Sequence, residues 1–91
     1  MKYQAKPGFV KRTIAGETLL VPTGAATREF NGMISLNESA SYLWDLLKDE
    51  KSMDELTAEM CKEFDAPADE IRSDCEAFIA NGLKENVISE K

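Results

Sequence analysis

The sequence predicts an α+β fold of the winged-helix kind, in which a three-stranded antiparallel sheet is followed by three helices. Short apolar and polar alternations separated by turn residues occupy residues 9–36, a pattern typical of strands. Apolar positions at helical spacing occupy residues 37–88, and this separation of strands from helices is typical of α+β domains. With 91 residues, the chain is expected to form a single domain, residues 1–91, around one core.

The first two strands are expected to form a hairpin. Residues 9–14 (FVKRTI) alternate apolar and polar side chains, and the three residues Ala15-Gly16-Glu17 provide a turn. Residues 18–21 (TLLV) then continue as strand formers. Pro22 ends this second strand, because proline has no N–H group to donate to a ladder.

The third strand is predicted at residues 33–36 (MISL), directly after the turn dipeptide Asn31-Gly32. The ten residues 23–32 join it to the hairpin, and we expect this loop to be the most mobile internal segment. Such a hinge allows strand exchange between two chains, so we expect a monomer in dilute solution or a strand-exchanged dimer.

The first two helices are predicted from their caps and their apolar spacing. Asn37 is an N-cap residue, and the helix that follows is expected to extend to about Lys48. Ser52 and Glu55 form the S-x-x-E pattern of a capping box, which opens the second helix.

The third helix is expected to begin after Pro67, because proline is tolerated in the first turn of a helix. Its end is open: the helix either ends at Asn81-Gly82 or continues towards Leu83. Val87 and Ile88 are expected to pack back on the core. The predicted core consists of apolar residues that recur at these spacings: Leu36, Leu43, Trp44, Leu47, Leu56, Met60, Phe64, Ile71 and Phe78.

Composition argues against several classes of function. The net charge of −6 disfavours nucleic acids and anionic membranes, since both attract cationic proteins. The chain has no histidine, which removes the usual proton shuttle and the commonest metal ligand. Cys61 and Cys75 are too far apart for a zinc motif, and we expect two buried or half-buried thiols. We therefore expect a cytoplasmic protein with no catalytic residues, no metal and no cofactor.

Several segments resemble the PqqD family. Its mark, L-N-E-x-A at the start of the first helix, matches residues 36–40, with Leu43-Trp44 after it. Residues 19–24 resemble the family's second strand and turn, residues 52–56 the start of its second helix, and Asp74 with Phe78-Ile79 its third helix. The resemblance implies a winged-helix-like, non-catalytic domain that binds the leader peptide of a ribosomally made precursor. It also implies a partner, namely a radical SAM protein or another peptide-modifying enzyme.

The predicted peptide site combines the edge of the third strand with one face of the third helix. An edge strand without Pro or Lys presents unpaired backbone groups to which an extended peptide can add. The expected contacts are Met33, Ile34, Ser35, Leu36, Arg72, Cys75, Glu76 and Ile79. The peptide is expected to alternate apolar residues and to carry some basic ones, although Cys75 and Ile79 could equally belong to the core.

Two other functions are considered. A winged-helix regulator that binds DNA or another protein is the main alternative, but the third helix carries four acids over residues 68–81 against Arg72 alone. The other is a structural subunit or interaction domain without a peptide ligand.

Overall fold

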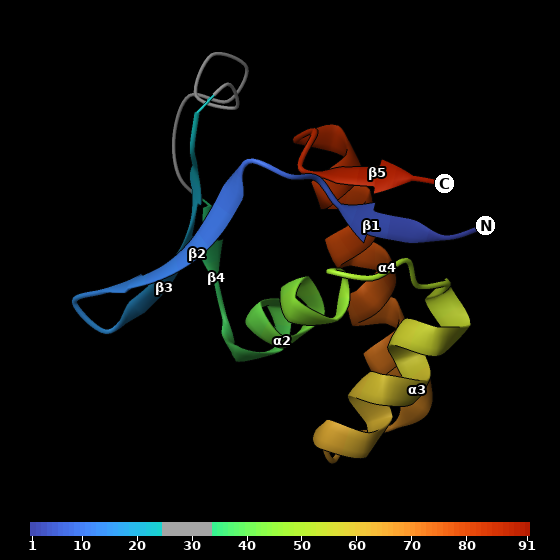
Figure 1. The fold of residues 1–91 in the computed structure, drawn as a ribbon. Helices are drawn as coiled ribbons and strands as arrows, with labels where there is room; N and C mark the ends of the chain where they lie inside the picture. Colours follow the sequence, from blue (N-terminus) through green and yellow to red (C-terminus); the bar gives the residue numbers. More distant parts are fainter. Residues whose placement is uncertain (25–33) are drawn as a thin grey trace.

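The computed structural model describes residues 1–24 and 34–91, and it confirms the predicted order of a three-stranded antiparallel sheet followed by three helices (Figure 1). α2 lies between this sheet and the pair formed by α3 and α4. In chain order the elements are β1 (Tyr3–Ala5), β2 (Phe9–Ile14), β3 (Glu17–Pro22), β4 (Ile34–Leu36), α2 (Glu38–Leu46), α3 (Met53–Glu63), α4 (Ala68–Lys84) and β5 (Ile88–Glu90).

The hairpin of β2 and β3 turns over two residues, whereas three were predicted. Ala15 and Gly16 both have positive φ, +53° and +82°, and Glu17 already pairs with Ile14. Two consecutive positive φ angles define the tight turn whose twist matches that of the flanking strands, so Glu17 can join the ladder. As predicted, the second strand ends at Pro22.

β4 pairs antiparallel with β3, with Leu36 opposite Thr18 and Ile34 opposite Leu20. The predicted third strand is therefore present over residues 34–36, and Met33 lies outside the described residues. The predicted hinge loop also lies outside them from residue 25 onward, so its mobility and strand exchange stay predictions.

A second sheet was not predicted. β1 pairs antiparallel with β5, which places the two ends of the chain side by side (Figure 1). Tyr3 also forms two backbone hydrogen bonds with Lys51, of 2.8 and 2.9 Å, on the connector between α2 and α3. The terminal segments and this connector thus form one hydrogen-bonded unit.

The helix caps agree with the prediction. The Asn37 side chain accepts a hydrogen bond of 2.8 Å from the Ala40 N–H group at the start of α2. In the capping box of α3, Ser52 Oγ accepts from the Glu55 N–H group at 3.1 Å, and Glu55 accepts from the Ser52 N–H group at 2.8 Å. That backbone hydrogen bond is the main reason why the pKa of Glu55 is lowered.

α4 continues through Gly82, and the packing of β5 explains the glycine. A Cβ atom at this position would lie 2.2 Å from Ile88 Cδ1, well inside van der Waals contact. Glycine lowers the stability of the helix by roughly 1 kcal/mol relative to alanine, but its lack of a side chain lets β5 approach closely. Val87 and Ile88 are both buried, as predicted.

The core confirms most of the predicted set, with two corrections. Phe64 and Phe78 are half-buried at the margin of the core, and Phe64 packs edge-to-face on Tyr42 with ring centroids 5.8 Å apart. Trp44 is 6% exposed and packs edge-to-face on Phe9. The buried hydrophobic residues are Leu20, Leu36, Leu43, Trp44, Leu47, Leu56, Met60, Ile71, Cys75, Ile79, Val87 and Ile88.

The two cysteines have different environments. Cys75 is fully buried, and this burial is the main reason why the pKa of its thiol is raised. Cys61 is exposed, so the expectation of a buried or half-buried thiol is wrong there, because the side chain lies on the solvent side of α3. Both thiols are free.

None of the helices formed by residues 1–24 and 34–91 has the length and apolar character needed to span a membrane.

Candidate functional site

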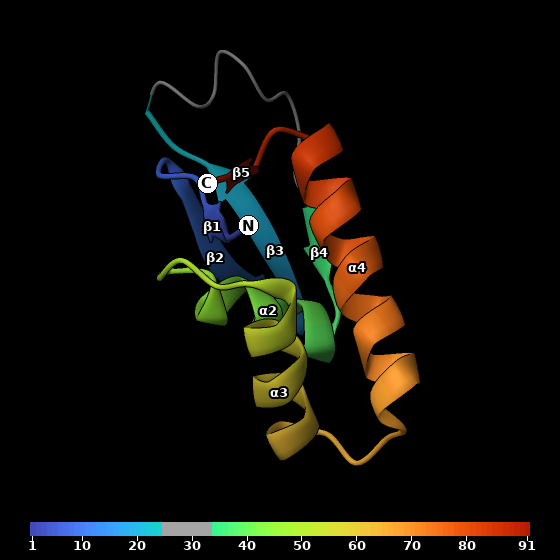
Figure 2. The same ribbon diagram turned by 90° about the vertical axis from the view of Figure 1, so that its right-hand side faces the viewer.

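β4 is an edge strand, and it is the strand of its sheet that lies nearest to α4 (Figures 1 and 2). β3 pairs with one of its sides, and no described strand pairs with the other. Leu36 is buried, Ile34 is half-buried and Ser35 is exposed, so the two apolar side chains face the core. In an edge strand, alternate N–H and C=O groups point outward without a ladder partner. This edge can therefore accept another extended chain.

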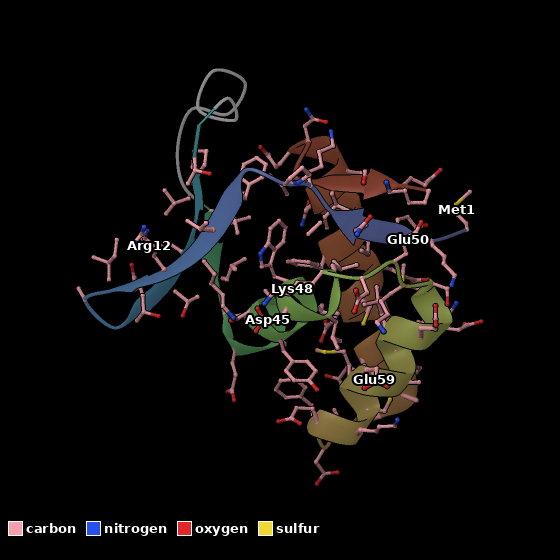
Figure 3. The ribbon with its side chains drawn as sticks, viewed as in Figure 1. Met1, Arg12, Asp45, Lys48, Glu50 and Glu59 are labelled. Carbon is pink, nitrogen blue, oxygen red and sulfur yellow. The ribbon has the colours of Figure 1, made fainter. Side chains whose placement is uncertain are left out.

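The opposite edge of the sheet, β2, is tied to α2 and carries cations. Lys11 donates hydrogen bonds to Ser41 Oγ at 2.9 Å and to Asp45 Oδ2 at 2.6 Å. Arg12 points away from the helices (Figure 3). Lysine and arginine discourage strand pairing at an edge, and β4 has neither. Of the two edges, β4 is the better acceptor for an added strand.

The four helix residues predicted for the site include two in the core and two in an ion-pair chain. Cys75 and Ile79 are buried, with exposed fractions of 0% and 3%. Arg72 Nη1 donates to Asp54 Oδ1 of α3 at 2.7 Å, and its Nε lies 3.6 Å from Glu76 Oε2. The hydrogen bond to Asp54 is the main reason why the pKa of Arg72 is raised. Arg72 thus reaches towards α3, and contact of these residues with a peptide stays a prediction.

A groove of three cavities begins at the end of β4. The first cavity, of about 430 Å³, lies between the β2–β3 turn, the end of β4 and the start of α2. The second, of about 190 Å³, lies between the start of α2 and α4. The third, of about 270 Å³, lies between the start of α2, the end of α3 and the start of α4. Asn37 lines the first two, and Ser39 and Asp74 line the last two, so the cavities adjoin one another.

The groove is mainly polar in its first cavity and gains apolar side chains in the second and third, with exposed acids in all three. Leu43, Met60 and Ile71 contribute buried apolar surface, and Phe64 and Phe78 are half-buried there. The exposed carboxylates among the lining residues are Glu17, Glu38, Asp65 and Asp74. Ligand pockets usually combine apolar walls with a few polar groups, and the third cavity has this composition.

The α4 side that lines the groove was missed by the site prediction. In the second cavity it consists of Asp74, Ala77 and Phe78, and Asp74 and Phe78 each lie one position along the helix from Cys75 and Ile79. One position is a rotation of about 100° around the helix, which is enough to exchange a groove residue for a core residue. A signal did exist, because Asp74 and Phe78 are among the third-helix residues that resemble the PqqD family.

Across residues 1–24 and 34–91, no group of three His, Cys, Asp or Glu side chains is placed to hold a metal ion. What the described surface offers is backbone pairing at β4, apolar contacts in the groove and negative charge along its rim. These features are of the kind that can receive an extended chain.

Comparison with known proteins gives a family and two structural neighbours. The family model described as "Coenzyme PQQ synthesis protein D (PqqD)" matches residues 17–88, whereas no curated protein sequence matches significantly. The structure of "TbiB1 in Complex with the TbiA(beta) Leader Peptide" is similar with a TM-score of 0.73 and 17% identity, over 97% of this chain and 96% of that chain. "Lasso peptide synthetase B1 complexed with the leader peptide" is similar with a TM-score of 0.69 and 16% identity, over the full length of both chains. At such identities the likeness establishes the fold, and because the family model matches most of the sequence, the chain belongs to the PqqD family.

Proposed function

We propose that this protein binds the leader peptide of a ribosomally made precursor by strand addition at β4, and presents it to a maturation enzyme without catalysing a reaction itself. The single observation that carries the proposal is the open edge of β4 beside a groove that leads to an apolar cavity, in a chain of the PqqD family. The two structural neighbours are each described in complex with a leader peptide, which supports the same type of ligand.

The proposed peptide contacts are the backbone of residues 33–36 and the side chains of α4. Backbone hydrogen bonds to β4 give affinity for an extended chain, and groove side chains give selectivity. The Arg72, Cys75, Glu76 and Ile79 side of α4 remains part of the proposal. Since Cys75 and Ile79 are buried, these two contribute by holding the helix in place against the core.

We further propose that the partner is a radical SAM protein or another peptide-modifying enzyme, and that the protein works in the cytoplasm as a monomer or a strand-exchanged dimer. The DNA-binding alternative gains no support from the comparisons. Arg72 is engaged by Asp54 and Glu76, so α4 has no free arginine to place against a phosphate.

An NMR titration tests the proposal. The ¹⁵N-labelled protein would be titrated with the synthetic leader of the precursor encoded beside its gene, and with a scrambled leader as the control. We expect saturable shifts at residues 34–36 and at Asp74 to Phe78 with the leader alone. Shifts confined to α3 and the turn at residues 15–18, with β4 silent, would overturn the proposed site.

A pair of proline variants separates peptide pairing from folding. Neighbouring N–H groups of a strand face opposite sides, so one of Ile34 and Ser35 donates towards β3 and the other towards the open edge. Proline removes the donor. We expect one of the variants Ile34→Pro and Ser35→Pro to lose stability, and the other to keep its urea midpoint but bind the leader at least tenfold more weakly. If the variant that keeps its urea midpoint binds the leader as tightly as the wild type, strand addition at β4 is excluded.

A further inference from the structure

The groove continues directly from the strand edge to which a peptide would add. Ser35 and Leu36 of β4 line its first cavity, and the adjoining cavities extend past the start of α2 to α3. A peptide that paired with β4 and continued past Leu36 would enter this groove. The segment of the peptide beyond the paired strand meets a chemically distinct surface.

That surface carries exposed carboxylates that have no cationic partner among the described residues. Glu17, Glu38, Asp65 and Asp74 are exposed along the groove, and no described Lys or Arg side chain lines the three cavities. None of these four carboxylates forms an ion pair with a described cation.

Elsewhere on the described surface some acids form ion pairs, and others, such as Asp49, Glu63 and Asp69, do not. The carboxylates of Asp45, Asp54 and Glu55 each have a Lys or Arg partner within 4 Å. Lys11 does donate to Ser41, which lines the first cavity, but its charge is already paired with Asp45 at 2.6 Å. Among residues 1–24 and 34–91, the acids along the groove therefore have no cationic partner.

The third cavity adds an apolar site next to two of these acids. Met60, Phe64 and Ile71 contribute its apolar lining, and Asp65 and Asp74 lie on the same lining. An apolar side chain of a ligand can enter between the end of α3 and the start of α4, while a neighbouring cation of the ligand reaches the carboxylate of Asp65 or Asp74. Long basic side chains suit this role, since their aliphatic stems cover apolar surface and their charged ends stay hydrated.

We infer that the groove selects leader peptides in which the segment leaving the β4 edge at Leu36 carries Lys or Arg beside an apolar residue. This inference rests on the proposed function and specifies the ligand class of the same site. Complementary charge gives selectivity and faster association, and the preference weakens as salt screens the carboxylates.

Selection from a random library tests the inference without knowledge of the natural ligand. Twelve-residue peptides displayed on phage would be selected on the immobilised wild-type protein. The same library would be selected in parallel on the variant Asp74→Lys, with Asp49→Lys as a control of equal charge change outside the groove lining. Circular dichroism would establish that each variant is folded.

We expect Lys and Arg to be enriched beside an apolar residue in the peptides selected by the wild type and by Asp49→Lys. The enrichment should be lost with Asp74→Lys. The best selected peptide should bind Asp74→Lys roughly fivefold more weakly or worse, and Asp49→Lys within about twofold of the wild type.

The outcomes separate the two proposals. Selected peptides that shift the NMR signals of β4 but show no basic enrichment and bind Asp74→Lys normally would overturn the charge selection and leave strand addition standing. Selected peptides that leave β4 silent would contradict both proposals. Enrichment that Asp49→Lys abolishes equally would show that overall charge governs selection, which also contradicts the inference.

Discussion

The two sides of α4 differ in what they contact. On one side, Cys75 and Ile79 are buried in the core, and Arg72 pairs with Asp54 of α3. On the other side, Asp74 and Phe78 line a groove that begins at the open edge of β4. Neighbouring positions of one helix thus face the core and the groove separately. The comparison teaches that a variant on the packed side tests the binding proposal only if its stability is measured alongside its binding.

The largest expected difference is in the reaction rates of the two thiols. At mildly alkaline pH, Ellman's reagent should react quickly with Cys61, which is exposed, and at least about a thousandfold more slowly with Cys75. Burial raises the pKa of Cys75, so its thiolate is scarce, and reaction requires local opening of the helix pair. A kinetic trace is the measurement. Loss of the fast phase in Cys61→Ser is the control, and two equal fast phases would contradict the packing described for α4.

Truncation on the packed side should be the most destabilising change in α4. Ile79→Ala should lower the free energy of unfolding by about 2 to 5 kcal/mol, because it leaves a cavity in a core that collapses incompletely. Ala77→Gln, on the groove side, should change the free energy of unfolding by less than about 0.5 kcal/mol. Urea unfolding measures both. Equal midpoints for the two variants would mean that the helix is rotated relative to this description.

A smaller loss is expected at the end of α4. Gly82→Ala adds a methyl group that would overlap the side chain of Ile88. Such overpacking typically lowers the free energy of unfolding by about 1 to 3 kcal/mol. The better helix propensity of alanine offsets about 1 kcal/mol of this cost. The net effect should be a modest fall in the thermal midpoint. A variant more stable than the wild type would show that β5 does not pack closely on Gly82.

The smallest effect is expected from the ion pair on the packed side. Arg72→Gln should leave the urea midpoint almost unchanged, because Arg72 and Asp54 are well exposed and water screens their attraction. If Arg72 contacts the peptide as proposed, leader binding in the NMR titration should weaken modestly while the urea midpoint holds. Unchanged binding would exclude Arg72 from the peptide site and limit the contacts of α4 to its groove side.

Local signals in the sequence predicted most of the fold. The hairpin, the capping box at Ser52 and Glu55 and the helical apolar spacing depend on neighbouring residues, and the structure confirms them. β1 and β5 were missed because each has three residues and the pairing joins opposite ends of the chain. No local pattern indicates such a long-range contact.

The candidate site was less predictable than the fold. The edge position of β4 followed from the expected strand order, because β2 pairs with the other side of β3 in the hairpin. The side of α4 that lines the groove depends on helix rotation, and a choice between Phe78 and Ile79 requires the position of α3. The partner of Arg72 lies on α3, so the sequence could not show that this cation is already engaged.

Strand addition at β4 is the central claim, and amide hydrogen exchange tests it most directly. Exchange rates for residues 34–36 would be measured by NMR in the free protein and in its complex with the leader peptide. At least one amide that faces the open edge should exchange tenfold or more slowly in the complex, because a hydrogen bond to the peptide replaces its contact with water. Unchanged exchange throughout residues 34–36 in a saturated complex would contradict the account.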